Sequence, residues 1–188
     1  YLQRCGTEIE DDTFGHVACH NTKATIYGTS ETIDVSGGWH DAGDYGRYVV
    51  PGAKTVADLL YAYAASPSSY GDATGIPESG NGVPDILDET RYELEWMLKM
   101  QADNGGVYHK LTSFVHADFL MPEEDKLPFL IYPVSTMATA DFAASMALAS
   151  RVYAPFDKAF STQALEASRK AFAYMESHPY IGFHNPEG

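Results

Sequence analysis

A mainly helical fold is predicted for this chain by the spacing of its apolar residues. Four segments carry apolar side chains three and four positions apart, as in helices that bury one face. Long connections with few regular signals separate the first three segments, and connections of such length are usually functional or disordered. This alternation of helix and long loop suggests a helical toroid with its loops gathered at one face.

The first helix is expected at about residues 51–65, where four apolar side chains recur at helical spacing: Val56, Leu59, Leu60 and Tyr63. The second helix is expected at about residues 84–101. Pro84 suits a first helical turn, and Asp85 and Asp88 lie close to the positive end of the helix.

The third helix is expected at about residues 135–153 and the fourth at about 160–177. The third is rich in Ala, Met and Leu nearly all round, which is typical of a helix buried on more than one side. Loops are expected at 66–83 and 102–134. Residues 1–51 contain many Gly, Thr, Asp and His, so we expect a mostly irregular region fixed by something other than a core. Only residues 1–4 read as the end of a strand.

Residues 37–48, Gly-Gly-Trp-His-Asp-Ala-Gly-Asp-Tyr-Gly-Arg-Tyr, place the carboxylates Asp41 and Asp44 three positions apart. Glycines let a backbone turn tightly and approach a ligand closely. Two short acids can share one water molecule there, and aromatic side chains offer faces on which sugar rings can stack. Taken alone, however, an Asp-x-x-Asp pair is more often a set of helix caps or solvated turns.

The composition limits the class of partner. The chain has 188 residues, enough for one domain with a sizeable core, and 12 basic against 26 acidic residues give a net charge of −14. This charge argues against nucleic acid and anionic membranes as partners, because both require basic patches. No apolar run approaches the roughly 20 residues of a transmembrane helix. The charge suits a neutral polymer such as a glucan, or simply a soluble acidic protein.

Residues 37–46 resemble the signature of glycoside hydrolase family 9, the endoglucanases and related cellulases. Four later segments resemble further landmarks of that family and follow the family order: residues 76–89, 105–112, 121–125 and 135–144. The likeness therefore covers nearly the whole chain.

The resemblance implies an (α/α)6 barrel, of which this chain would supply about the first four helices. Residues 1–51 would form a metal-stabilised loop region with the catalytic base, and residues 52–188 part of the helical toroid. Family catalytic domains are more than twice this long, so we expect the N-terminal part of such a domain without its C-terminal remainder. The resemblance also implies a secreted protein, with any signal peptide upstream of Tyr1.

The resemblance implies that Asp44 is the general base and that Asp41 helps to bind and orient the nucleophilic water. Inverting glycosidases pair such a base with an acid, and their carboxyl groups lie roughly 6.5–9.5 Å apart. The family's acid is a Glu near the end of the catalytic domain, and Glu187 lies too early in the family order. The general acid is therefore expected outside this chain.

Two thiols and two imidazoles form a donor set for structural zinc: Cys5, Cys19, His20 and His40. On spacing alone, zinc and a Cys5–Cys19 disulfide are equally supported. The resemblance favours zinc, because one subgroup of the family binds it through two Cys and two His in this region. His16 is an alternative ligand. A metal on His40 would stiffen the backbone that presents Asp41.

Four oxygen ligands gather around Gly80 and Gly82: Glu78, Asn81, Asp85 and Asp88. Calcium takes six to eight such oxygens, and many members of the family bind calcium. Capping at the start of the second helix by Asp85 and Asp88 explains the pattern equally well.

Several side chains are candidates for contacts to sugar. Aromatic rings could stack on it and polar groups could bond its hydroxyls, although single aromatics more often belong to the core. The candidates are Trp39, Tyr45, Tyr48, Tyr108, His109 and Lys110.

The predicted reaction is the inverting hydrolysis of β-1,4-glucosidic bonds in cellulose or a related β-glucan, with this chain supplying the base. Two alternatives remain open. The chain could be a catalytically incomplete piece that binds glucan or pairs with its C-terminal complement through exposed apolar surface. It could also belong to an exo-acting cellobiohydrolase or glucosidase of the same fold.

Overall fold

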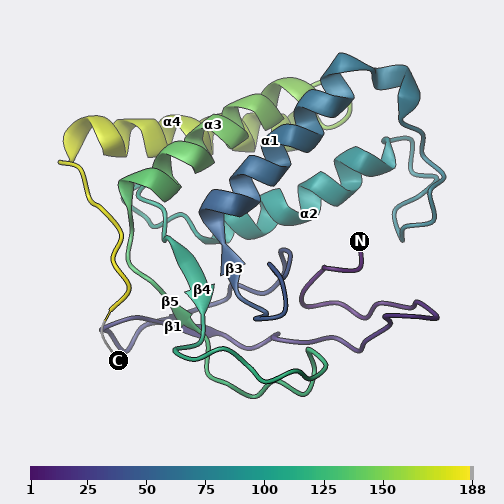
Figure 1. The fold of residues 1–188 in the computed structure, drawn as a ribbon. Coiled ribbons are helices and arrows are strands. Elements are labelled where there is room, and N and C mark those ends of the chain that lie inside the picture. The colour runs from purple at the N-terminus through teal and green to yellow at the C-terminus, as the bar shows by residue number, and fades with distance from the viewer. Residues whose placement is uncertain (187–188) are drawn as a thin grey trace.

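The computed structural model describes residues 1–186, which form four α-helices and a small five-stranded sheet (Figure 1). The helices are α1 (Val49–Ala65), α2 (Asp85–Lys99), α3 (Thr136–Tyr153) and α4 (Lys158–Ser177), and a short 3-10 helix, η1 (Pro67–Ser69), follows α1. The predicted mainly helical fold is confirmed for the described residues, because each helix begins and ends within two residues of its expected bounds.

The first two helices each bury one face and pack against each other. The buried side chains of α1 lie three or four positions apart: Val49, Ala53, Val56 and Leu60. Pro84 directly precedes α2, and Asp85 and Asp88 lie in its first turn, where the helix dipole favours negative charge.

Helix α3 lies between α1 and α4 and contacts both (Figure 1). Its small residues allow burial on more than one side, as the sequence pattern predicts. The hydroxyl of Ser135 accepts a hydrogen bond from Ala138 N at 3.1 Å and caps α3. Asp157 caps α4 in the same way, with Phe160 N as the donor at 3.0 Å.

The sheet was not predicted. Its strands run in the order β2–β1–β5–β4–β3, with bounds β1 (Ala24–Ile26), β2 (Thr32–Ile33), β3 (Arg47–Tyr48), β4 (Lys110–Thr112) and β5 (Leu130–Ile131). β1 and β5 are parallel, with Ile26 opposite Ile131, and the other neighbours are antiparallel. Strands of two or three residues are too short to show an alternating pattern, so periodicity does not reveal them.

The two regions expected to be irregular are mostly irregular, but they contain short elements that were not predicted. Residues 1–51 contain β1, β2, β3 and the start of α1, and the loop expected at 102–134 contains β4 and β5. Among residues 1–4, Arg4 alone pairs, through an isolated bridge to Trp39. The sheet thus joins the N-terminal region to the connection between α2 and α3.

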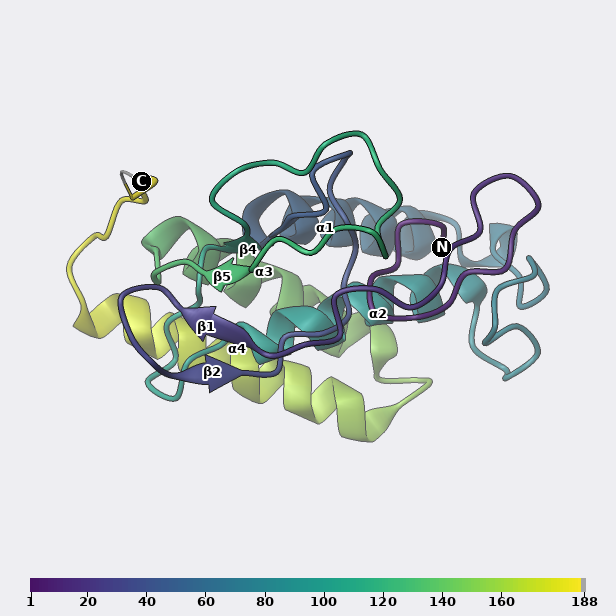
Figure 2. The same cartoon turned by 90° about the horizontal axis from the view of Figure 1, so that it is seen from below.

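The strands and the N-terminal segment lie on one side of the helices (Figure 1). Figure 2 is viewed from that side, and β1 and β2 cross in front of the helical layer. The expected gathering of loops at one face holds only in part, because the connection between α2 and α3 reaches this side whereas the connection between α1 and α2 lies at the far end of those two helices (Figure 1). Because α1 begins directly after β3, the acidic motif at residues 37–48 lies on this side as well.

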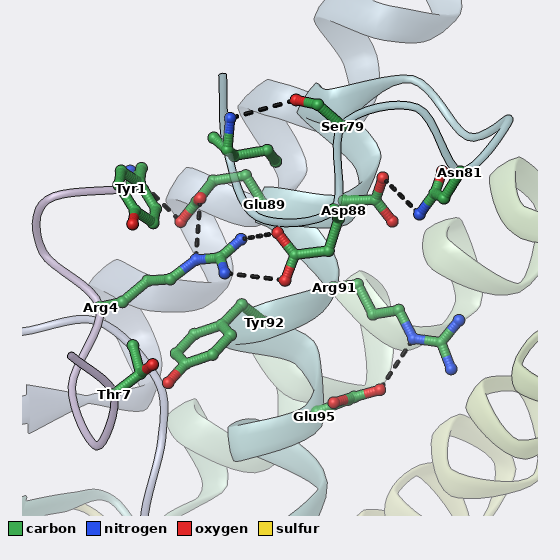
Figure 3. Close-up of polar contacts among 12 residues, drawn as sticks. Tyr1, Arg4, Thr7, Ser79, Asn81, Asp88, Glu89, Arg91, Tyr92 and Glu95 are labelled. Carbon is green, nitrogen blue, oxygen red and sulfur yellow. Dashed lines mark hydrogen bonds and ion pairs between the residues drawn. The ribbon is translucent and has the colours of Figure 1, made fainter. Parts of the chain in front are cut away.

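Arg4 fastens the N-terminal segment to α2 (Figure 3). Its guanidinium donates two hydrogen bonds to Glu78, at 2.9 and 3.0 Å, and one to Glu89 at 3.0 Å. The ring of Tyr92 lies beneath it, with 4.5 Å between the guanidinium carbon and the ring centroid. Arg4 is only 2% exposed, so these contacts satisfy a buried charge.

Apolar side chains remain exposed on the helices: Tyr61, Met137 and Phe172 are each more than half exposed. A groove of about 400 Å³ lies between α1 and α3, with Ala53 and Leu148 among its walls. Of the helices in the described part of the chain, none is both long and apolar enough to cross a bilayer. Residues 187–188, including Glu187, lie outside the described residues.

Candidate functional site

The two acids of the motif lie on a tight turn that leads into β3. Asp41 N donates a hydrogen bond to Gly46 O at 2.9 Å, which closes the turn. Gly38 precedes the turn with φ +77°, and a Cβ there would lie 2.6 Å from the Trp96 ring, so the position requires glycine. The turn leaves Asp41 exposed and Asp44 partly buried.

Asp44 is held through both carboxylate oxygens. Gly46 N donates to Oδ1 at 2.9 Å, and the Tyr48 hydroxyl donates to Oδ2 at 2.6 Å. His116, from the connection between β4 and β5, places Nδ1 3.4 Å from Oδ2. Nothing in the sequence pattern singled out His116, because its approach to Asp44 depends on the fold of that connection.

Asp41 borders an open cavity of about 340 Å³ between the N-terminal segment, α1 and α2. Although Asp41 is exposed, partial desolvation beside the cavity raises the pKa of its carboxyl, and the negative charge of Asp44 raises it further. Trp39, Tyr48, Glu89 and Glu93 also line the cavity. An acid fixed by hydrogen bonds and a more accessible acid therefore lie on one turn beside an open space.

Helix α2 fixes Trp39 on the wall of this cavity. The indole nitrogen of Trp39 donates to Glu89 Oε1 at 2.6 Å, and its backbone nitrogen donates to Glu93 Oε2 at 2.7 Å. Tyr45 has φ +54°, and its hydroxyl donates to Leu120 O in the connection between β4 and β5. Both aromatic side chains are therefore positioned by segments distant in sequence.

Two candidates for sugar contacts lie on or beside β4. Lys110 pairs with Tyr48 across β3 and β4, and its ammonium lies 5.6 Å from the centroid of the Tyr48 ring. His109 Nδ1 lies 2.8 Å from Ser135 Oγ, and its ring stacks on Phe183 at a centroid distance of 3.8 Å.

Tyr108 packs against the core. Burial raises the pKa of its hydroxyl, and the charges of Glu31 and Asp103 raise it further. In the described structure, the cavity beside Asp41 is lined by Trp39 and Tyr48 but not by Tyr108. Two other predicted sugar contacts, His109 and Lys110, also do not line this cavity.

The four predicted metal ligands come together. Cys5, Cys19, His20 and His40 each offer a ligand atom, and these atoms lie within 4.8 Å of one another. Cys19 Sγ is 3.5 Å from His40 Nε2. Cys5 N donates to the carbonyl of residue 38 at 2.8 Å, so the N-terminal segment runs beside the acidic motif. Both thiols are free, and the alternative Cys5–Cys19 disulfide is not formed.

The residues fit a zinc ion in their chemistry. A hydrogen bond with Cys5 lowers the pKa of the Cys19 thiol, and His20 and His40 lower it further, although burial opposes them. Burial lowers the pKa of His40, which keeps the imidazole in its neutral, metal-binding form. Within the described residues, His20 Nδ1 is buried without a hydrogen-bond partner, which leaves it available as a metal ligand.

His16, the alternative ligand, is not part of this group. Its Nδ1 lies 2.8 Å from Val17 O, and its ring centroid is 6.2 Å from that of His40. The donor set that the fold assembles is therefore the one that the resemblance implies.

A second acidic group combines Asp85 and Asp88 with Asp72, which no sequence pattern singled out. Asp85 is buried, and its Oδ2 accepts hydrogen bonds from Thr74 and Ser79. Its Oδ1 has no hydrogen-bond partner in the part of the chain that the structure describes. An unsatisfied buried carboxylate oxygen beside two further acids is compatible with a calcium ion.

The other two expected calcium ligands each bind another side chain. Glu78 binds Arg4, and Asn81 Nδ2 donates to Asp88 at 3.1 Å. Helix capping was the alternative explanation. No side chain of the described residues forms a capping hydrogen bond at Pro84, the N-cap residue of α2. Asp85 and Asp88 still lie in the first turn of α2.

Glu93 is a fully buried acid behind the motif. Burial raises its pKa to about 8, although the hydrogen bond from Trp39 N and the charge of Arg47 oppose the rise. Its protonated form is therefore favoured in the folded protein over a wide range of pH.

The raised pKa of Glu93 predicts that the free energy of unfolding falls as pH rises. Glu93 is favoured as the neutral acid in the folded state, so its contribution is complete below the ordinary pKa of 4.5 and is lost as pH rises through about 8. Glu93→Gln should flatten this part of the profile, because glutamine can still accept the Trp39 hydrogen bond. Urea unfolding between about pH 5 and about pH 8 measures it.

Glu95→Gln is the matched control, since Glu95 lies on the same helix and its side chain is 53% exposed. Its profile should follow that of the wild type. If the unfolding free energies of the wild type and Glu93→Gln change equally with pH, Glu93 is not the group that causes the fall.

Comparisons with known proteins identify the family to which the chain is similar. The family model for glycosyl hydrolase family 9 matches residues 1–187. A cellodextrinase from Butyrivibrio fibrisolvens is 42% identical, over 100% of this chain and 36% of that protein. The chain therefore spans about a third of that relative.

Two solved structures are similar in fold. A metagenome-derived glycoside hydrolase family 9 endoglucanase has a TM-score of 0.93 and 42% identity, covering 96% of this chain and 34% of its own. A Zn-binding triple mutant of the family 9 endoglucanase J30 has a TM-score of 0.91 and 37% identity, covering 100% of this chain and 38% of its own.

Proposed function

Because this chain belongs to glycosyl hydrolase family 9, we propose that it forms the N-terminal part of a catalytic domain that hydrolyses β-1,4-glucosidic bonds in cellulose or a related β-glucan. The observation that carries this proposal is the acidic turn, with Asp44 fixed by Tyr48 and Asp41 beside an open cavity. The names of the relatives, a cellodextrinase and an endoglucanase, support the substrate class.

In the proposed reaction, Asp44 is the general base that takes a proton from the attacking water. The hydrogen bonds from Gly46 N and Tyr48 hold its carboxylate in one orientation, which a positioned base requires. Asp41 accepts a hydrogen bond from the same water and orients it. The water attacks the anomeric carbon from the face opposite the leaving oxygen, so the configuration inverts.

We place the general acid outside this chain. The two acids share one short turn, whereas the carboxyl groups of inverting glycosidases are roughly 6.5–9.5 Å apart and flank the bond. The chain spans 36% of the cellodextrinase, and the family resemblance places the acid near the end of the catalytic domain. The isolated chain is then expected to bind glucan without hydrolysing it.

The four helices are proposed to be part of an (α/α)6 barrel that a C-terminal partner segment completes. The exposed apolar side chains of Tyr61, Met137 and Phe172 support this proposal, because a completing segment would cover such surface. The division into a metal and base region at 1–51 and a barrel portion from residue 52 is proposed on the same ground.

Trp39 and Tyr48 are proposed to contact sugar beside the acids, since both line the cavity that Asp41 borders. Tyr45, Tyr108 and His109 stay predictions as sugar contacts. The partner is proposed to be a β-1,4-glucan, which as a neutral polymer suits a chain of net charge −14 better than nucleic acid or an anionic membrane does. Secretion, implied by the family, remains a proposal.

Zinc is proposed as a structural ion on Cys5, Cys19, His20 and His40. With four protein ligands a zinc ion cross-links segments and leaves no open position for chemistry. Here it would join the segments around residues 5, 19 and 40, and His40 directly precedes Asp41. The similarity to a Zn-binding mutant of a family 9 endoglucanase supports this choice of metal.

Calcium is proposed as a second ion, on Asp72, Asp85 and Asp88. The buried, unsatisfied Oδ1 of Asp85 supports it. Such an ion would hold the connection between α1 and α2 against the first turn of α2.

Proton NMR of cellohexaose incubated with this chain tests the proposed function. Turnover with the α-anomer appearing before mutarotation would support inverting hydrolysis and would overturn the placement of the acid outside the chain. Broadening of the sugar resonances without turnover would support a chain that contributes the base and part of the cleft. Absence of both binding and turnover would contradict a glucan-directed function.

Asp44→Asn is the matched control, because asparagine keeps the size of the side chain and cannot act as a base. Any turnover should disappear in this variant while binding persists. The pattern of products separates the alternatives: a range of oligosaccharides indicates endo action, and cellobiose or glucose alone indicates an exo-acting enzyme.

A further inference from the structure

A buried acidic residue, Asp125, lies beside the four predicted metal ligands and is not itself one of them. Asp125 Oδ2 lies 3.3 Å from His20 Nε2, and the two side chains are 1% and 6% exposed. The residues are 105 positions apart in the chain. Asp125 Oδ1 accepts a hydrogen bond from Leu127 N at 2.9 Å, so its own loop orients the carboxylate.

This contact assigns different roles to the two nitrogens of His20. Nε2 has Asp125 as its partner, whereas Nδ1 is buried with no hydrogen-bond partner among the described residues. A carboxylate accepts hydrogen bonds, so Nε2 carries the proton and Nδ1 keeps its lone pair. Metal-binding histidines commonly donate their other N–H to a carboxylate or carbonyl, which sets the tautomer and the ring orientation.

The orientation of the His20 side chain is not fixed by regular secondary structure. Its backbone has φ +49°, in the left-handed region that residues other than glycine rarely adopt. It lies outside the helices and strands, directly after Cys19. The ring of Phe129, 4.7 Å away between centroids, packs against the imidazole, but an aromatic ring does not choose between its nitrogens.

We propose that Asp125 is the positioning residue of the metal centre, which holds His20 through Nε2–H and presents Nδ1 to zinc together with Cys5, Cys19 and His40. This inference rests on the proposed zinc site. No assigned ligand supplies this function, and the sequence pattern placed residues 121–125 only as a family landmark.

The same loop also reaches the acidic turn. Leu120 O accepts the hydrogen bond of the Tyr45 hydroxyl, and Tyr45 follows Asp44 directly. Asp125 therefore anchors the connection between β4 and β5 at the metal, five residues from its contact with the acidic turn.

Zinc affinity of the intact chain, measured by competition with a chromophoric chelator, tests the proposal. Asp125→Ala should bind zinc about 10–100-fold more weakly, which is the usual cost of losing such a partner. Asp125→Asn should lose less, because its amide oxygen can still accept from Nε2–H. Asp118→Asn is the matched control, since it removes the same charge from the same loop at a position outside the metal group, and its affinity should equal that of the wild type.

Nitrogen-15 NMR of the His20 ring gives a readout that a merely structural role would not change. The zinc-bound wild type should show Nδ1 on the metal and a slowly exchanging proton on Nε2, and Asp125→Ala should exchange that proton faster. If Asp125→Ala does not fold, the zinc affinity of Asp125→Asn tests the proposal, and it should be lower than that of the wild type.

The outcomes separate the two proposals. A wild-type chain that binds no zinc would overturn the metal site and this inference with it. A wild type that binds zinc through Nε2 of His20, or an Asp125→Ala variant with unchanged affinity and exchange, would overturn only the role of Asp125.

Discussion

Removal of zinc by a chelator should lower the melting temperature of this chain by about 10 °C. A ligand present at a thousand times its Kd stabilises the folded state by about 4 kcal/mol, and 1 kcal/mol shifts the melting temperature by about 2–4 °C in a chain of this size. Cys5, Cys19 and His40 lie in segments that the described helices do not contain, so a metal bound to them would add a cross-link to the backbone hydrogen bonds, such as Cys5 N to Gly38 O, that already join two of these segments. Thermal unfolding followed by circular dichroism, with and without the chelator, measures the effect.

Cys19→Ser should abolish the response to the chelator, because it removes a thiolate from the group. His184→Ala, at a histidine far along the chain and outside the metal group, should leave the response intact. A chain that ignores the chelator but melts earlier in the presence of a reductant would contradict zinc and restore the disulfide alternative.

Arg4→Ala should cost about 3 kcal/mol of unfolding free energy, the lower end of the range for removing one partner of a buried ion pair, because Arg4 and Glu89 are largely buried but Glu78 is 35% exposed. The substitution would leave Glu78 and Glu89 without the three hydrogen bonds that they accept from the guanidinium, and Tyr92 without the cation above its ring. The N-terminal segment that carries Cys5 would keep two contacts with α2, from the Tyr92 hydroxyl to Cys5 O and from the Tyr1 ammonium to Glu89, but would lose its guanidinium contacts there. Urea unfolding at neutral pH gives the difference.

Arg91→Ala is the matched control on α2, and Figure 3 shows the contact of Arg91 with Glu95. The Arg91 side chain is 34% exposed and its ion pairs face solvent, so the cost should stay near 1 kcal/mol or below. Arg4→Lys should fall between the two, because an ammonium cannot make the forked contact with Glu78. Equal costs for Arg4→Ala and Arg91→Ala would show that the buried pair contributes no more than a surface one.

The helices could be predicted because the information for them is local. The apolar spacing in α1, the proline before α2 with the acids of its first turn, and the small residues of α3 all act within a few residues of the element that they define. The short strands could not be predicted in this way. β1 and β5 pair across more than 100 residues, and each is too short to show its own period.

Some residues of the candidate site could likewise be predicted from the sequence, and others could not. Asp41 and Asp44 stand in one motif, and the four metal ligands were recognisable as a donor set, because residue type and resemblance were sufficient to propose them. His116 beside Asp44, Asp72 beside Asp85 and Asp125 beside His20 carried no local signal. His116 and Asp125 lie in the connection between β4 and β5, and Asp72 lies in the connection between α1 and α2, so their partners are set by the fold of these long connections.

Residue order alone was enough to specify four helices, an acidic turn and a set of two thiols and two imidazoles. The folded structure was needed to establish how these parts are supported: the strand order, the attachment of the N-terminal segment by Arg4, and the partner of each carboxylate and imidazole. The difference is one of range. Helix periodicity and turn chemistry act between neighbours in the chain, whereas buried hydrogen bonds and ion pairs are satisfied by whichever distant group the packed fold places within reach.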